Sequence, residues 1–248
     1  MPDQGHIAVT RAGRGPEVLL VHGGASPATT WSGLERLSES WTLAFAHRRG
    51  YPPSPQAVDG RQDFEVDAAD LAPLLDHRPH LVAHSYGAVG AVIAAARRPE
   101  RVRSLTLLEP AIFEPADDPE VDRFRSIGDT VLRHGLETDP AALREFLTIA
   151  GAPITGDGPL PEEVKRGVRR AQGSRPPSEA RLPLHQLGRA GFPTLVASGN
   201  HAPVIERMCD AVAAALNSRR VITPGAGHFV AAAPQFPASL ERFLLEAS

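Results

Sequence analysis

Short apolar runs recur along the chain and are separated by longer stretches whose apolar residues follow helical spacing. The runs end near glycine, proline or small polar residues, where a buried strand gives way to a loop. Parallel strands joined by crossover helices produce this alternation. The runs predict strands at Val18–Val21, Thr42–Ala46, Leu81–Ala83, Leu105–Leu108, Thr194–Ala197 and Val221–Ile222, with an antiparallel strand at His6–Thr10 before them.

The stretches between the runs predict helices. Between residues 64 and 75, valine and leucine recur near one helical face, while Asp63, Asp67 and Asp70 suit the first turn and the solvent side. An alanine-rich stretch that stops before Pro99 suits a tightly packed helix. The predicted helices of this group are Phe64–Leu75, Ala88–Arg98 and Ser239–Leu245.

One long segment interrupts the rhythm. From about residue 112 to residue 191 no strand-like run occurs, and the content of proline, acidic residues and arginine rises. Helical patterns occur in it at Val121–Arg133, Ala141–Ile149 and Glu162–Ala171. A long insertion between two strands of an α/β sheet is more often a lid than a linker. We therefore predict a core formed by residues 1–111 and 192–248, and a helical lid insertion over residues 112–191.

Composition narrows the classes of protein. The chain has 248 residues, of which 42% are hydrophobic and 22% charged, as expected for one globular domain. The net charge of −3 implies no nucleic-acid partner, and the single cysteine, Cys209, excludes an intramolecular disulfide and a multi-cysteine metal site. No apolar run approaches the ~20 residues of a membrane helix, and residues 1–15 lack the apolar stretch of a signal peptide. We expect a cytoplasmic monomer or homodimer with no membrane partner.

The strongest chemical signal is Ala83-His84-Ser85-Tyr86-Gly87, which lies between a predicted strand and a helix of small residues. A serine at a tight strand-to-helix turn, with small residues two positions before and after it, is typical of a nucleophile elbow. The N-terminus of the following helix also favours developing negative charge. An ordinary loop would match so short a motif, but the strand and helix around it favour Ser85 as a nucleophile.

A second signal, His22-Gly23-Gly24, also follows a predicted strand. Glycine lets the backbone approach a bound carbonyl group and direct an amide at its oxygen. We predict an oxyanion hole formed by the N–H groups of Gly24 and of Tyr86, the residue after the candidate nucleophile. Two glycines after a strand also form simple tight turns, and the pairing with Ser85 is what favours the catalytic interpretation.

A third signal is His228, on the glycine-rich loop that follows the last predicted strand. From this loop an imidazole can reach the edge of the sheet where Ser85 is expected, accept the serine proton and return it to the leaving group. The chain has ten histidines, so its place in the chain is what singles His228 out.

These motifs, together with Arg49-Gly50-Tyr51 and Leu107-Leu108-Glu109-Pro110, occur in the order and spacing of the α/β-hydrolase fold superfamily. The chain resembles this superfamily over nearly its whole length, apart from the predicted lid. The resemblance implies a mostly parallel eight-stranded sheet flanked by helices, a Ser–acid–His triad and a two-amide oxyanion hole. It implies no particular substrate, because this fold supports many chemistries.

The chain departs from the superfamily at the acid of the triad. Most members carry an aspartate after the penultimate strand, and Ala202 occupies that position here. Glu109, at the end of the preceding strand, is our preferred replacement, because some relatives place the acid there and a group must fix the histidine tautomer. The alternatives are Asn200 as a neutral orienting group and a protein that has lost hydrolysis. Relatives with a standard triad can also end this strand in an acid.

Aromatic residues near the motifs are candidates for substrate binding, although core packing explains each of them equally well. His201 lies beside the missing acid and can fill its space. Several histidines near one site suggest a metal, but no carboxylate or cysteine spacing supports one, so neither a metal nor a cofactor is expected. The candidate substrate-binding residues are Trp31, Phe113, Phe146 and Phe229.

Together the residues predict a serine esterase or lactonase that cleaves a small, fairly apolar ester or lactone through an acyl-enzyme. Hydrolysis of a carbon–carbon bond or a thioester is chemically close. Dehalogenases and epoxide hydrolases of this superfamily use an aspartate nucleophile, so Ser85 argues against both. The alternative from another class is a non-catalytic small-molecule-binding protein, suggested by the absent aspartate. Cofactor-free oxygen or peroxide chemistry would use the same residues.

Overall fold

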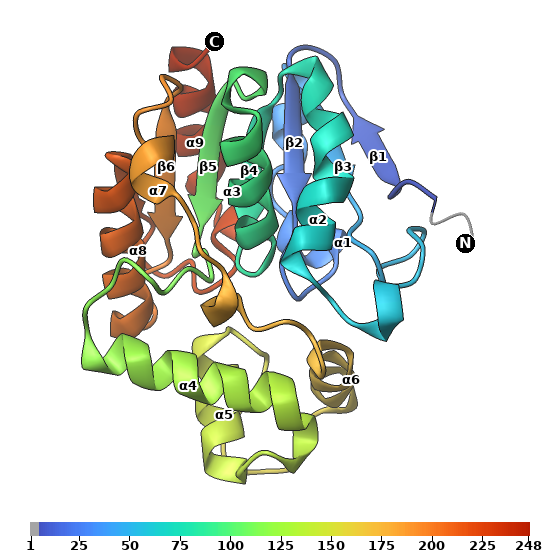
Figure 1. The fold of residues 1–248 in the computed structure, drawn as a ribbon, viewed down its shortest axis with the longest axis vertical. Coiled ribbons are helices and arrows are strands. Elements are labelled where there is room, and N and C mark those ends of the chain that lie inside the picture. Colours follow the sequence, from blue (N-terminus) through green and yellow to red (C-terminus); the bar gives the residue numbers. More distant parts are fainter. Residues whose placement is uncertain (1–4) are drawn as a thin grey trace.

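A seven-stranded sheet forms the centre of the computed structural model, which describes residues 5–248 (Figure 1). The strand order is β1-β3-β2-β4-β5-β6-β7. Neighbouring strands are parallel except for β1 and β3, which are antiparallel. The strands are β1 (Val9–Ala12), β2 (Glu17–Val21), β3 (Thr42–Ala46), β4 (His80–His84), β5 (Ser104–Leu108), β6 (Thr194–Ser198) and β7 (Arg219–Ile222).

The expected fold class is confirmed, but the strand count differs from the eight that the resemblance implied. Within residues 5–248 the sheet has seven strands, which correspond to the six apolar runs and the antiparallel strand predicted before them. The first strand begins at Val9 rather than His6, because pairing with β3 starts at the register Val9↔Ala46. Residues 1–4 of the predicted core lie outside the described part of the chain.

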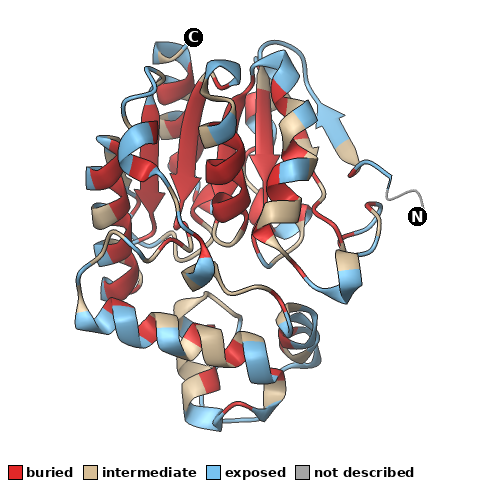
Figure 2. Cartoon of the chain, in the orientation of Figure 1, coloured by how far each residue is buried: buried red, intermediate tan, exposed pale blue. Residues whose placement is uncertain are grey.

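Helices cover both faces of the sheet. The first face packs against α2 (Phe64–Leu71), α3 (Gly87–Arg97), α7 (Leu184–Leu187) and α8 (Pro203–Leu216), and the second against α1 (Pro27–Thr30) and α9 (Phe236–Glu246) (Figure 1). Alternate residues of β2 serve the two faces, since Leu19 and Val21 pack in the first layer and Val18 and Leu20 in the second. The central strands are therefore buried along their length (Figure 2).

Short 3₁₀ helices complete the connections. They are η1 (Glu35–Glu39), η2 (Val58–Gly60), η3 (Ala72–His77), η4 (Pro99–Arg101), η5 (Gly135–Glu137), η6 (Pro177–Glu179) and η7 (Val230–Ala232). The predicted helix at residues 64–75 is thus an α-helix to Leu71 that tightens into η3, where Pro73 cannot donate a backbone hydrogen bond.

Residues 112–191, which we call the insertion, connect β5 to β6 and carry α4 (Pro119–His134), α5 (Pro140–Ile149) and α6 (Glu162–Ala171). Asp118 and Asp139 cap the first two helices by accepting backbone N–H groups, and a proline follows each cap. The three helices lie together beyond the carboxyl ends of the parallel strands (Figure 1). They share a small apolar core formed by Val131, Leu143, Leu147, Val164 and Val168.

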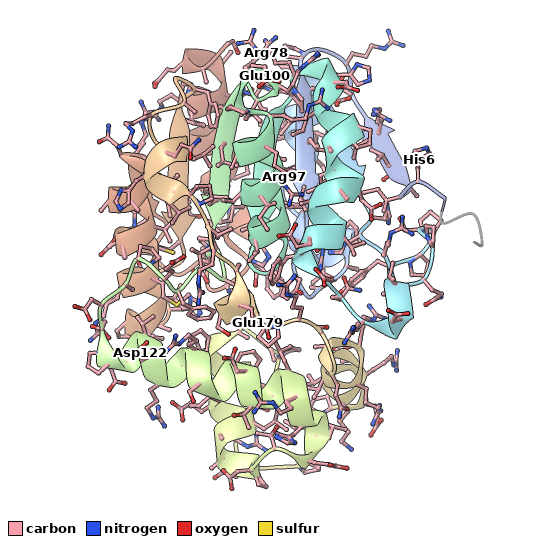
Figure 3. All side chains as sticks on the ribbon, in the orientation of Figure 1. His6, Arg78, Arg97, Glu100, Asp122 and Glu179 are labelled. Atoms are coloured by element: carbon pink, nitrogen blue, oxygen red, sulfur yellow. The ribbon has the colours of Figure 1, made fainter. Side chains whose placement is uncertain are left out.

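Charged side chains cover the outside of both ends of the molecule. Figure 3 labels Asp122 and Glu179 on the insertion, and Arg78 and Glu100 at the opposite end of the sheet. The exact limits of the insertion, residues 112 and 191, stay predictions. No helix among residues 5–248 is long and apolar enough to cross a membrane.

Candidate active site

Ser85 occupies the turn between β4 and α3 and has a φ angle of 51°, in the left-handed region. Its N–H donates to Leu108 O at 3.0 Å, and its carbonyl accepts from Ala111 N at 3.1 Å. These two bonds tie the turn to the end of β5. A non-glycine residue in this conformation is strained and persists only where its surroundings hold it. The geometry is that of the predicted nucleophile elbow.

Two glycines make the turn possible. A Cβ atom on Gly87 would lie 2.2 Å from His22 O, and one on Gly23 would lie 2.7 Å from the Cβ of Ser85. Both distances are far below van der Waals contact, so the elbow and the loop after β2 can approach only without these side chains. These steric limits explain why glycine occupies positions 23 and 87 of the two motifs.

His228 and Glu109, which are 119 residues apart in the chain, form a hydrogen bond at the same edge of the sheet. Nδ1 of His228 lies 2.7 Å from Oε2 of Glu109. His228 lies next to the elbow, because its ring centroid is 4.6 Å from that of His84, the residue before Ser85. Within residues 5–248 no hydrogen bond joins Ser85 Oγ to His228, and in a site without substrate such catalytic bonds are often long and tighten only in the complex.

Glu109 is only 2% exposed and is held on both carboxylate oxygens. Its Oε1 accepts a hydrogen bond from Gly199 N at 2.7 Å, and its backbone takes a φ angle of 42°. Burial alone would raise the pKa of this carboxyl, but the interactions with His201 and His228 outweigh it and lower the pKa to about 2. Glu109 is therefore ionised at neutral pH and available to stabilise an imidazolium.

Neither the residue at the usual aspartate position nor the neutral alternative, Asn200, contacts the histidine through its side chain. Ala202 is the N-cap residue of α8 and offers no polar atom. The backbone N–H of Asn200 donates to Glu206 Oε1 at 2.9 Å, and the residue is exposed. In the described part of the chain the Asn200 side chain makes no hydrogen bond to His228. Of the two candidates named from the sequence, Glu109 is the one that contacts the histidine.

The loop that carries Gly24 is anchored through its carbonyl groups. Gly23 O accepts hydrogen bonds from Arg48 Nη1 at 2.9 Å and from His22 Nδ1 at 3.0 Å, and Gly24 O accepts one from the Tyr51 hydroxyl at 2.7 Å. A trans peptide directs its C=O and N–H to opposite sides. Fixing Gly23 O therefore fixes the direction of the Gly24 N–H, the predicted oxyanion donor.

The second predicted donor, the N–H of Tyr86, lies at the N-cap of α3, directly after Ser85. In residues 5–248 no backbone acceptor is paired with this N–H or with that of Gly24, so both are free for a ligand. The Tyr86 hydroxyl points to the insertion, where it donates to Arg175 O at 2.9 Å. Tyr86 thus connects the elbow to the end of the insertion.

The Arg48 side chain belongs to a buried polar network that the sequence did not suggest. Arg48 is 2% exposed, and its guanidinium pairs with Asp67 at 2.7 Å and donates to Gln62 Oε1 at 2.8 Å. Tyr86 packs on the same guanidinium, with its ring centroid 4.8 Å away. Asp67 was expected on the solvent side of α2, and that expectation is wrong because Arg48 reaches it from the end of β3.

His22 and His84 are buried neutral side chains. Burial lowers the pKa of each side chain to about 3. The nearby charge of Arg48 lowers the pKa of His22 further, and the His228 side chain has the same effect on His84. His22 donates through Nδ1 to Gly23 O and accepts from Arg48 N, which fixes its tautomer. His84 Nε2 donates to His228 O at 3.0 Å. Both residues hold loops and neither is placed to transfer a proton.

The four predicted substrate-binding aromatics lie in different places. Phe229 stacks on His84, with 5.5 Å between centroids, and lies against His228. Phe113 and Phe146 both contact Phe124 within the insertion. Trp31 is 3% exposed, packs in the core layer on the second face of the sheet, and lies edge-on to His84 with 6.4 Å between ring centroids. Of the four, Phe229 is the one whose ring contacts His228 itself.

Glu109, His201 and His228 each offer one atom that could bind a metal ion, and these atoms lie within 4.8 Å of one another. The sequence predicts no metal site, because it shows no ligand spacing. The three residues come from three separate segments, so spacing in the sequence could not reveal the group. In this geometry the His228 Nδ1 is already hydrogen-bonded to Glu109, and a metal ion would replace that bond.

Comparison with known proteins places this geometry in a family. The model of the alpha/beta hydrolase family matches residues 18–239. A pimeloyl-[acyl-carrier protein] methyl ester esterase of Methylococcus capsulatus is 30% identical over 70% of this chain and 66% of its own length. A 2-(acetamidomethylene)succinate hydrolase of Mesorhizobium japonicum is 28% identical over 90% of this chain and 85% of its own length. The match to the Methylococcus protein thus spans just under two thirds of that relative.

Solved structures agree on the fold. A thermophilic esterase from Thermogutta terrifontis superposes with a TM-score of 0.67 at 24% identity, covering 97% of this chain and 93% of that chain. The family match spans both the elbow and the histidine loop. The chain therefore belongs to the alpha/beta hydrolase family.

Proposed function

We propose that this protein is a serine hydrolase that cleaves a carboxylic ester or lactone of a small, fairly apolar molecule through an acyl-enzyme. The observation that carries the proposal is the 2.7 Å contact between Glu109 Oε2 and His228 Nδ1, beside a serine with left-handed backbone geometry. A buried carboxylate on Nδ1 fixes the histidine tautomer that leaves Nε2 free to accept a proton.

In the proposed reaction Ser85 Oγ attacks the carbonyl carbon of the substrate and gives its proton to His228 Nε2. The N–H groups of Gly24 and Tyr86 stabilise the oxyanion that forms. His228 then protonates the leaving alcohol, and an acyl group remains on Ser85. A water molecule, deprotonated by His228, hydrolyses this acyl-enzyme and restores the serine.

The position of the insertion supports a role as the lid of this site. Its contacts reach the elbow through Tyr86 and Arg175 O, and reach the histidine loop through Gly151, where a Cβ atom would lie 2.4 Å from the Cβ of His228. A cover over the carboxyl ends of the strands excludes water from the reacting atoms. Phe113 and Phe146 belong to this lid, and Phe229 to the core beneath it.

The curated esterase relative acts on a methyl ester, and this favours an ester for the present chain. The substrate panel for the test therefore contains methyl and aryl esters, lactones, a thioester and a diketone with a cleavable carbon–carbon bond. Turnover of the last two without any turnover of esters would favour the chemically close alternatives.

The decisive experiment is mass spectrometry of the intact protein after exposure to a fluorophosphonate. We expect one adduct on Ser85 in the wild type and none in Ser85→Ala, because an activated serine attacks phosphorus as it attacks a carbonyl carbon. A folded wild-type protein that forms no adduct would support the non-catalytic binding protein, and ligand screening would follow.

A further inference from the structure

His201 lies on the loop after β6 and contacts an acceptor with each of its ring nitrogens. Nε2 lies 2.9 Å from the backbone oxygen of Ile149, the last residue of α5 in the insertion. Nδ1 lies 3.3 Å from Oε1 of Glu109. The imidazole therefore lies between the candidate catalytic acid, Glu109, and Ile149 of the insertion. These two residues are 40 positions apart in the sequence.

The hydrogen-bonding groups determine where the protons are. A backbone carbonyl only accepts hydrogen bonds, so Nε2 must carry a proton. In the neutral ring Nδ1 would then present a lone pair to a carboxylate oxygen, and two acceptors would face each other. Nδ1 is shielded from solvent and, within residues 5–248, has no hydrogen-bond partner, so the Glu109 carboxylate is the charged group that faces it, at 3.3 Å. A second proton, on Nδ1, would replace the repulsion between these two acceptors with a charge-assisted contact.

We propose that His201 is held as an imidazolium and is a positioning residue that connects Glu109 to the insertion at Ile149. The proposal rests on the proposed triad, since it assigns the role of His201 through Glu109. By occupying Oε1 together with the Gly199 N–H, His201 leaves Oε2 directed at His228. It also directly precedes Ala202, the residue at the position of the missing aspartate.

The surrounding charges agree with this protonation state. Glu109, directly after β5, and Glu206 on α8 favour the charged ring, whereas burial opposes it, and the His228 ring lies 6.1 Å away on the histidine loop. The interaction with Glu109 is the largest of these effects, and the pKa of His201 is raised above its usual value. The bond to Ile149 O raises it further.

The anchored carbonyl lies two residues before the point where the insertion covers the catalytic histidine. Gly151, with a φ angle of 73°, packs so closely on His228 that a Cβ atom would lie 2.4 Å from the histidine Cβ. Holding Ile149 O in place therefore holds the residues that cover His228. Loss of the charge on His201 weakens the contact with Glu109 and the anchor of the insertion at once.

The direction of the pH effect follows from His201. A group with a raised pKa carries its proton at low pH and loses it as pH rises through that pKa. His201 positioning is therefore lost on the alkaline side, so the rate at which Ser85 is labelled should decline there, with this limb set by His201.

The first test is ¹⁵N NMR of the full-length protein with ¹⁵N-labelled histidine rings. The protein is first treated with EDTA to remove bound metal ions. Comparison with His201→Gln assigns the His201 signals, and His185→Gln, at an exposed histidine, is the matched control. We expect both His201 nitrogens to keep their protons to a higher pH than a histidine with the ordinary pKa. A ring that loses its proton at or below the ordinary pKa of histidine overturns the proposal. A ring that is neutral until Zn²⁺ is added also overturns it, because the bridging cation would then be a metal.

The second test is the rate at which a fluorophosphonate labels Ser85 as a function of pH. We expect His201→Gln to label more slowly, by on the order of tenfold to a hundredfold, and to lack the alkaline decline of the wild type. A merely structural role would lower the rate and leave the limb in place, and that result overturns the proposal. If the wild type is never labelled, the proposed hydrolysis fails, and the NMR result still decides the state of His201.

Discussion

Glu109 combines three features that rarely coincide in a side chain of purely structural function. Its carboxylate is almost fully buried, its backbone lies in the left-handed region, and each oxygen faces a different donor. Such strain in a buried ionised residue persists only where neighbouring groups hold it, and it concentrates at active sites. At the residue scale Glu109 is therefore the position at which the proposed chemistry is most directly tested.

Glu109→Gln should lower the turnover number for an ester substrate by about 10⁴-fold, because a glutamine amide does not stabilise the imidazolium and can select the wrong histidine tautomer. Steady-state kinetics on the best ester of the substrate panel measures the effect. Asn200→Ala is the matched control, since its side chain is exposed, and it should change turnover little. Small and equal effects of the two substitutions would remove Glu109 from the triad.

Most candidate residues of the site were recognisable from the sequence because each lies directly after an apolar run. Ser85, Gly24 and Glu109 follow strands β4, β2 and β5, and parallel strands bring their carboxyl ends to one edge. Arg48 also follows a strand, but its partner Asp67 lies on α2. Nothing in the spacing of the two residues indicates that contact, so the network behind Gly23 was missed.

At the scale of elements, the Arg48–Asp67 pair joins the segment after β3 to α2, beside the loop of Gly23 and Gly24. The guanidinium also reaches Gly23 O and Gln62. Taking two charges out of water is costly, and removing one partner leaves the other uncompensated. The pair therefore connects two parts of the fold. Its loss would lower the free energy of unfolding and would also remove the support that Arg48 gives to Gly23 O.

Asp67→Asn should destabilise the protein by about 3–5 kcal/mol, because Arg48 would remain buried without a counter-charge. Urea unfolding of the two proteins measures the difference. Glu65→Gln removes half of an exposed pair between α2 and Arg97 and should cost less than about 1 kcal/mol. A change of similar size in both variants would contradict the assigned importance of the buried pair.

The insertion contacts the histidine loop most closely at Gly151. Gly151→Ala should slow labelling of Ser85 by a fluorophosphonate, since the new methyl group would lie 2.4 Å from the His228 Cβ and displace either the loop or the insertion. Gly156→Ala is the matched control. It lies in the same insertion with a φ angle of 57°, and a Cβ atom on it would meet no other atom within 4 Å. Equal labelling rates for the two variants would show that Gly151 does not control His228.

Element prediction succeeded where helical periodicity was accompanied by clear ends. Asp118-Pro119 and Asp139-Pro140 mark the starts of α4 and α5, and the observed helices begin within two residues of the predicted ones. The fourteen-residue helix α8 was not predicted. Its start at Pro203 follows Ala202, which supplies no capping side chain, so the usual signal for a helix N-terminus is absent.

At the scale of the whole molecule, acid stability depends on histidines that are buried without charge. His22 and His84 hold loops at the site, and His80 lies at the start of β4 with Nδ1 bonded to Ser104 Oγ. Burial lowers the pKa of all three, to about 3 for His22 and His84 and about 4 for His80. In the unfolded chain each would bind a proton near pH 6.5.

The unfolded state therefore binds more protons than the native state between about pH 6 and pH 4, so stability falls as pH is lowered through this range. Three such groups give a slope on the order of 4 kcal/mol per pH unit. Urea unfolding at a series of pH values measures it. His80→Gln should reduce the slope by about one proton, whereas His185→Gln, at an exposed position, should leave it unchanged. Stability that stays constant from about pH 6 to pH 4 would mean that these histidines gain protons in the folded protein, and the neutral roles assigned to His22 and His84 would then be wrong.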